Sequence, residues 1–195
     1  MKNKMKNAEY FKDIHNLLQN TSVTDANGRK ILLGDSSIRI IKSILGLKKT
    51  NNKLIFIGNG GSASIASHMS TDFLKNGGIP AIAFNDASLI TCLSNDLGYE
   101  NVFKRPIEML AVKGDLLISI SSSGRSANIL QATRAAKKKS CSVITFSGFD
   151  SGNPLRRLGG INFYIKSHSY GYVEIAHSIL CHCILDTIVE RAKHG

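Results

Sequence analysis

The chain has 195 residues, and 43% of them are hydrophobic, which suits one domain of ordinary size with a proper core and excludes a disordered protein. Its formal charge of +11 does not predict a nucleic-acid surface, because the basic residues are dispersed and the one short run, residues 137–139, stands at an expected helix end. Four cysteines without C-x-x-C spacing, a start unlike a signal peptide and no run of eighteen apolar residues predict a reduced, cytoplasmic protein that crosses no membrane.

The first third of the chain reads as helical. Residues 4–19 carry apolar side chains at a spacing of three to four, which predicts an amphipathic helix. A polar, turn-rich interval (20–28) separates it from a second helix that starts near residues 35–37, an Asp-Ser-Ser sequence that offers several N-caps. We expect residues 1–34 to be a helical extension of the same fold, with its apolar stripe buried on the sheet or on a neighbouring subunit, ahead of one domain at 35–195.

The next unit is a strand, a glycine turn and a helix. Residues 54–57 form a short apolar run that ends in the sequence Gly-Asn-Gly-Gly-Ser at 58–62, and residues 63–76 have helical character. In open α/β sheets such a turn lies at the carboxyl end of a strand and directs backbone N–H groups at an anion. The turn lacks both a G-K-[ST] sequence and a G-x-G-x-x-G sequence, so nucleotide binding gets little support.

The remaining elements alternate between strands and helices. Strands are expected at residues 80–84, 115–120, 142–146 and 161–165, and helices after residue 85 and at 103–112, 127–138 and 172–192. In the last helix, Ile175 and Ile179 are expected among the inward residues. The alternation predicts a three-layer αβα sandwich around a five-stranded parallel sheet.

A serine-rich turn follows the strand at 115–120. It contains four hydroxyls in six residues at the start of a helix, contributed by Ser121, Ser122, Ser123 and Ser126. Hydroxyls and free backbone donors together match a phosphate monoester, whereas the alternative is a turn that only caps its helix. Because a second such turn ends the strand at 54–57, ligand binding is favoured.

Ionisable side chains gather on two of the expected helices. His68 and Asp72 are four residues apart and therefore share a face, although a surface ion pair would explain them equally simply. The last helix carries Glu174, His177 and His182, and Glu174 lies within about 80° of His182 around the helix axis. A histidine in such apolar surroundings is usually a hydrogen-bonded core residue.

Five motifs in this order resemble those of the phosphoheptose isomerase family, which belongs to the sugar isomerase (SIS) domain proteins. They are Gly58-Asn59-Gly60-Gly61-Ser62, His68-x-x-x-Asp72, Ser94-Asn95-Asp96-Leu97-Gly98-Tyr99, the sequence ISSSGRSAN at 120–128, and Glu174-x-x-His177-x-x-x-x-His182. The likeness runs from about residue 35 to residue 190.

The resemblance implies an SIS fold, usually a homotetramer, that interconverts sedoheptulose 7-phosphate and D-glycero-D-manno-heptose 7-phosphate for bacterial surface polysaccharide. It implies that the serine turn binds the phosphate through Ser121, Ser123 and Ser126, and that the glycine turn and the Asn95-Asp96 pair reach the sugar. The implied substrate-binding residues are Asn59, Gly60, Gly61, Ser62, Asn95, Asp96, Ser121, Ser122, Ser123, Ser126 and Glu174.

The resemblance also implies the chemistry. Asp72 stands where the family has its base, which takes a proton from the carbon beside the carbonyl, and His182 matches the acid that protonates the oxygen, giving a cis-enediol. Several family members hold zinc at the positions of four residues, so we expect zinc or a similar divalent cation on His68, Asp72, Glu174 and His182. A hydrogen-bonded polar cluster between two helices is the alternative.

Three positions depart from the family pattern. Asp72 replaces a glutamate, which withdraws the carboxylate by about 1.5 Å, and a misplacement of this size can cost on the order of a hundredfold in rate. Glu174 replaces a glutamine, and the second carboxylate favours a divalent cation. Gly171 replaces an aspartate, which suggests a different sugar or a roomier site.

Two other functions remain open. The chain could be a non-catalytic SIS tetramer that docks onto a protein such as a replication initiator, or an isomerase of another sugar phosphate. The retained acids and imidazoles favour an enzyme, because burying such groups is costly unless they are used or paired. Asp72 in place of glutamate favours the scaffold.

Overall fold

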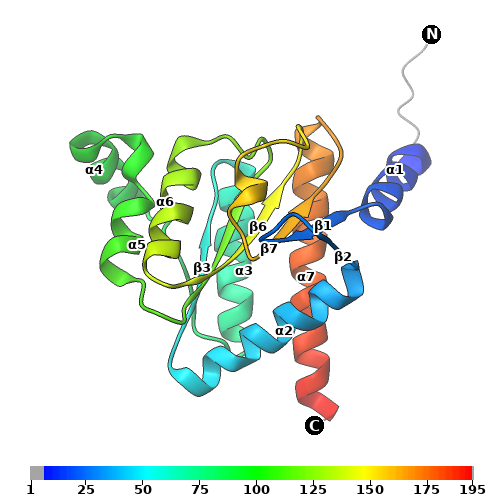
Figure 1. Ribbon diagram of the computed structural model, residues 1–195, viewed down its shortest axis with the longest axis horizontal. Coiled ribbons are helices and arrows are strands. Elements are labelled where there is room, and N and C mark those ends of the chain that lie inside the picture. Colours follow the sequence, from blue (N-terminus) through cyan, green and yellow to red (C-terminus); the bar gives the residue numbers. More distant parts are fainter. Residues whose placement is uncertain (1–6, 195) are drawn as a thin grey trace.

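The computed structural model describes residues 7–194 and arranges them as one twisted sheet between two layers of helices (Figure 1). The strands run in the order β2-β1-β7-β6-β5-β3-β4. Their bounds are β1 Ser22–Asp25, β2 Lys30–Ile31, β3 Leu54–Ile57, β4 Ala81–Ala83, β5 Leu116–Ser121, β6 Ser142–Ser147 and β7 Ile161–Tyr164. The helices are α1 Asn7–Gln19, α2 Leu33–Thr50, α3 Gly61–Lys75, α4 Ala87–Leu97, α5 Lys104–Leu110, α6 Ala127–Lys138 and α7 Tyr170–His194.

The five strands from β7 to β4 are parallel, and the central strands β3 and β5 are buried on both faces. Alternate residues of β3 serve different layers: Phe56 packs with α2, α3 and α7, whereas Ile55 and Ile57 pack with α5 and α6. Figure 1 shows these two groups of helices on opposite sides of the sheet. Strands buried on both faces read as continuous apolar runs, and the expected three-layer α/β sandwich is confirmed.

The sheet has seven strands rather than the expected five, because the N-terminal segment adds a hairpin. β1 pairs antiparallel with β7, from Ser22 opposite Tyr164 to Asp25 opposite Ile161, and β2 pairs antiparallel with β1. The Asp25 carboxylate accepts the backbone N–H groups of Asn27 and Arg29 at 2.8 and 2.9 Å and so shapes the turn. A four-residue strand is too short to show an alternating pattern, which is why this interval read as a loop.

The second helix starts earlier than its serines suggested. α2 begins at Leu33 without a side-chain cap, and the Ser36 and Ser37 hydroxyls donate instead to the Leu33 carbonyl at 2.7 and 3.0 Å. The expected caps at 35–37 are therefore wrong, because serine can satisfy its hydroxyl inside a helix as well as at its start.

The long helix α7 lies along the sheet beside α3 (Figure 1). An 18-residue stretch of this helix is long and apolar enough to cross a membrane, but the core helix of a soluble protein has the same length and composition. Val173, Ala176 and Leu180 are buried, whereas Ile175 and Ile179 are 37% and 40% exposed, so these two were wrongly expected inside. A helix that is apolar nearly all round gives no pattern by which to choose its inner face.

Candidate functional site

The glycine turn after β3 and the serine turn after β5 meet in one pocket of about 260 Å³. β3 and β5 are neighbouring parallel strands, so their carboxyl ends lie at the same edge of the sheet. The residues that line the pocket are Asn59, Gly60, Gly61, Ser62, Ser121, Ser122, Ser123, Ser126, Tyr170 and Glu174. The structure thus brings together all the predicted substrate-binding residues except Asn95 and Asp96.

Three helices begin at this pocket. Gly60 and Ser126 are the N-cap residues of α3 and α6 and make no side-chain cap hydrogen bond, and Tyr170 is the first residue of α7. All three line the pocket. The N-terminus of a helix carries partial positive charge and free N–H groups, so the pocket attracts an anion.

The serine turn contains a buried hydroxyl group that makes no hydrogen bond within the described residues. Ser122 is only 5% exposed, and its Oγ has no hydrogen-bond partner within residues 7–194. The neighbouring Ser121 Oγ is engaged, because it accepts the Gly124 N–H at 3.2 Å and lies 3.4 Å from Ser126 Oγ. Buried polar groups are nearly always hydrogen-bonded, so the Ser122 hydroxyl needs a partner that residues 7–194 do not supply in this arrangement.

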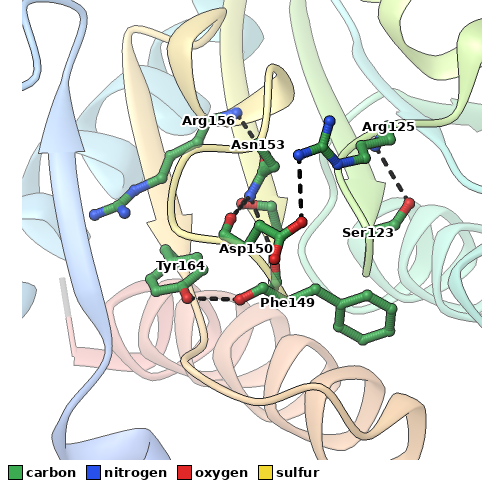
Figure 2. Close-up of polar contacts among 9 residues, drawn as sticks. Ser123, Arg125, Phe149, Asp150, Asn153, Arg156 and Tyr164 are labelled. Atoms are coloured by element: carbon green, nitrogen blue, oxygen red, sulfur yellow. Dashed lines mark hydrogen bonds and ion pairs between the residues drawn. The ribbon is translucent and has the colours of Figure 1, made fainter.

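The loop after β6 lies beside the serine turn and contacts it (Figure 2). The Gly148 N–H donates to the Ser122 carbonyl at 2.9 Å, and the Leu155 N–H donates to the Gly124 carbonyl at 3.2 Å. Gly124 has a φ of 63°, and a Cβ there would overlap the buried Asn153 side chain. The Asn153 amide in turn donates to Ser147 Oγ, the Gly148 carbonyl and the Asp150 carbonyl.

The glycine turn is tied to α6 by a pair of amides. Asn59 Nδ2 donates to Asn128 Oδ1 at 2.9 Å, and Asn128 Nδ2 donates to Asn59 Oδ1 at 2.8 Å. The Tyr99 hydroxyl adds a donor to Asn59 Oδ1 at 3.1 Å. The two turns are therefore locked to each other before any ligand binds.

Glu174 closes the pocket from the side of α7. Its carboxylate lies against Gly61, the first residue of α3, so closely that a Cβ at Gly61 would overlap it. A carboxylate beside a helix N-terminus is stabilised by the helix dipole. Glycine at position 61 therefore leaves room for the acid that faces it, and a larger residue there would displace the end of the Glu174 side chain.

Farther along the same two helices, His68, Asp72 and His182 form a cluster. Each offers one ligand atom, and these three atoms lie within 4.8 Å of one another. His68 Nε2 is 3.3 Å from Asp72 Oδ2, and the rings of His68 and His182 are 5.2 Å apart. Two imidazoles and a carboxylate are a donor set that zinc accepts in catalytic sites, so these residues fit the expected metal.

Glu174 stands apart from this cluster, although it was predicted as the fourth ligand. Eight helical residues separate it from His182, which is about 12 Å along the axis. The angle around the helix suggested that they were neighbours, but the rise along the helix places Glu174 at the pocket and His182 about two turns beyond it.

Asn95 and Asp96 lie on α4 and do not line the pocket. Asn95 Nδ2 donates to Asp96 Oδ1 at 2.8 Å, and both residues are exposed. Their contact with a substrate stays a prediction.

His177, the third ionisable residue that the sequence analysis singled out on α7, is fully buried. Its Nε2 lies 3.2 Å from the Ser147 carbonyl, its ring meets Phe146 edge to face, and desolvation lowers its pKa to about 4. It is a neutral core residue and belongs to neither the pocket nor the cluster.

Comparison with known proteins agrees with this geometry. The SIS domain model matches residues 9–148. The phosphoheptose isomerase of Aliarcobacter butzleri is 37% identical over 152 residues, which cover 75% of this chain and 80% of that protein. The chain belongs to the phosphoheptose isomerase family of SIS-domain proteins.

The phosphoheptose isomerase of Salmonella dublin is 34% identical over 187 residues, or 90% of this chain and 94% of that protein. A solved phosphoheptose isomerase from Francisella tularensis has a TM-score of 0.82 at 26% identity, and the match covers 98% of this chain and 100% of that one. The resemblance noted in the motifs is confirmed. The SIS match begins at residue 9, inside the segment that we set apart as an extension.

The sequence of this phosphoheptose isomerase family member did not reveal one of its pocket residues. Tyr170 lines the pocket, and its ring meets Phe149 edge to face with centroids 4.8 Å apart. The last helix was expected to begin at Tyr172, so Tyr170 read as part of a loop. Its place four residues before Glu174, on the same face of a helix, is the signal that could have found it.

Proposed function

We propose that the protein interconverts sedoheptulose 7-phosphate and D-glycero-D-manno-heptose 7-phosphate in the cytoplasm, for synthesis of a bacterial surface polysaccharide. The observation that carries this proposal is the unpartnered Ser122 hydroxyl in a pocket where three helices begin, since a phosphate group satisfies both features. The names of the relatives support the sugar, because they are phosphoheptose isomerases.

The distance between the pocket and the cluster suits a seven-carbon substrate. Gly61 and His68 are seven residues apart on α3, which is about 10 Å along the axis. An extended heptose 7-phosphate spans about 10 Å from phosphorus to C1 when C–C bonds of about 1.5 Å are laid end to end in a zigzag. A sugar whose phosphate lies at the pocket would therefore extend as far as His68, whose Nε2 is 3.3 Å from Asp72 Oδ2. The backbone of Asp72 lies farther on, eleven residues or about 16 Å from Gly61 along the axis.

In the proposed reaction, Asp72 removes the proton from the carbon beside the carbonyl and His182 donates a proton to the carbonyl oxygen, which gives a cis-enediol. Asp72 then gives its proton to the other carbon while His182 takes the proton from the other oxygen, which becomes the carbonyl of the isomer. Glu174, at the pocket, accepts hydrogen bonds from sugar hydroxyls. A zinc ion on His68, Asp72 and His182 would instead polarise a carbonyl as a Lewis acid, and Asp72 would not be a free base while it held the ion.

We also propose that the protein acts as a homotetramer that binds neither nucleic acid nor membranes. α1 has no buried residue, and its Phe11 is 67% exposed. Ile175 and Ile179 on α7 add further exposed apolar surface. A second copy of the chain would bury these side chains, which otherwise contact water at a cost.

A coupled assay with sedoheptulose 7-phosphate tests the activity. We expect turnover by protein whose tetrameric mass has been verified by light scattering. No turnover with or without added zinc would refute the isomerase and leave the scaffold, whereas turnover of a different ketose phosphate in a parallel panel would correct the substrate.

A further inference from the structure

Arg125 is the one charged residue of the serine turn, residues 121–126. It stands between Ser123 and Ser126, which both line the pocket, and its Cα lies about 3.8 Å from that of Ser126. Its backbone N–H donates to Ser123 Oγ at 3.2 Å. Its side chain does not enter the turn, because the guanidinium Nη2 meets Asp150 Oδ2 at 3.2 Å (Figure 2).

The ion pair between Arg125 and Asp150 is not what holds the two loops together. Backbone hydrogen bonds from Gly148 and Leu155 already join them, and the Asn153 amide fixes the loop that carries Asp150. The two charged side chains are 60% and 55% exposed. Exposed ion pairs contribute little to stability, so this contact can be exchanged for another at small cost.

A phosphate group in the pocket is a stronger partner for Arg125 than Asp150 is. A phosphate monoester carries a charge of about −1.5 to −2 and three acceptor oxygens, whereas Asp150 carries one negative charge. The planar guanidinium matches phosphate with two parallel hydrogen bonds. The nearby Ser122 hydroxyl has no hydrogen-bond partner in the part of the chain that the structure describes.

We propose that Arg125 is a phosphate-binding residue of the serine turn. Its guanidinium pairs with Asp150 in the absence of substrate and exchanges this carboxylate for the substrate phosphate when substrate binds. This inference rests on the proposed binding of phosphate by the serine turn. It makes Asp150 a competitor of the substrate rather than a part of its binding site.

Calorimetric titration with inorganic phosphate at fixed ionic strength tests the exchange without any need for activity. Arg125→Gln removes one charge-assisted contact and weakens phosphate binding about tenfold. Asp150→Asn releases the guanidinium and tightens binding about two- to fivefold. The double variant binds phosphate as Arg125→Gln does, because Asp150 acts only through Arg125.

Arg134→Gln is the matched control, because Arg134 is exposed on α6, nine residues from Arg125, and its loss changes the net charge equally. Equal dissociation constants for phosphate in the Arg125→Gln and Arg134→Gln proteins would overturn the proposal. So would tighter phosphate binding by the double variant than by Arg125→Gln alone. Arg125→Lys keeps the positive charge but loses the planar pair of guanidinium donors, so it is expected to bind phosphate less tightly than wild type. It replaces Arg125→Gln in the test if that variant does not fold.

The control titration of the wild-type protein separates this inference from the proposed function. Wild-type protein that binds phosphate without dependence on Arg125 would overturn the inference alone. Wild-type protein that binds no phosphate would overturn the role of the serine turn as well.

Discussion

Gly61→Ala should separate the stability of the protein from its activity. A Cβ at position 61 would lie 2.6 Å from Glu174 Oε1, whereas ordinary contacts begin near 3.5 Å, so the carboxylate must retreat by about 1 Å. Crowding of a flexible side chain costs about 1 kcal/mol at the low end of the range for overpacking. Alanine regains about 1 kcal/mol over glycine in a helix, so the free energy of unfolding should change little.

The activity should change far more, because a 1 Å displacement of a substrate-contacting group can cost roughly a hundredfold in rate. We expect kcat/KM for sedoheptulose 7-phosphate to fall by about that factor while the urea midpoint stays within experimental scatter. Gly61→Ala can also be made in a Glu174→Gln background. If the displaced end of the side chain is responsible, kcat/KM should fall there by the same factor. If the position of the negative charge is responsible, kcat/KM should fall much less.

Gly46→Ala is the control for glycine replacement, since a Cβ there meets nothing within 4 Å and Gly46 lies inside α2. It should raise the free energy of unfolding by up to about 1 kcal/mol and leave kcat/KM unchanged. A Gly61→Ala protein with wild-type kcat/KM would refute the placement of Glu174 at the substrate.

Three further outcomes are expected. His68→Ala should abolish zinc binding measured by competition with a chromogenic chelator, whereas Glu174→Gln should leave the affinity within a few-fold, because Glu174 lies apart from the cluster. Ser122→Ala should leave the phosphate-free melting temperature unchanged or slightly raised but weaken phosphate binding by about tenfold; equal phosphate affinity would contradict the role of the hydroxyl. Burial lowers the pKa of His177 from 6.5 to about 4, so the unfolded chain binds more protons between these values and stability falls as pH drops through this window. Urea denaturation should show a loss of about 2 kcal/mol between pH 7 and pH 5, which His177→Gln should remove.

The parallel part of the fold could be predicted because its signals are local. Residues 54–57 and 115–120 each form a buried run that ends in small residues, and every such strand is followed by a helix. The β1–β2 hairpin could not be predicted in the same way, because its pairing partner, β7, is more than 130 residues away. A short edge strand is specified by that partner rather than by its own pattern.

The candidate site could also be predicted only in part, for similar reasons. The two turns were found because each stands directly after a strand, and their meeting in one pocket follows from the adjacency of β3 and β5. Tyr170 and Arg125 were not singled out, because their roles depend on contacts with Phe149 and Asp150, which belong to a loop with no repeating pattern.

The pairing of α3 with α7 explains why one angular argument succeeded and another failed. Gly61 meets Glu174 at the start of the two helices, and His68 meets His182 about two turns farther along, so the helices run side by side in the same direction. His68 and Asp72 are one turn apart, which keeps them within reach of one ion. Glu174 and His182 share a face but are about 12 Å apart along the axis, and in the proposed reaction they contact different parts of the substrate. In the proposed reaction, the two ends of this helix pair therefore have different roles, with anion and hydroxyl recognition at the pocket and proton transfer at the cluster.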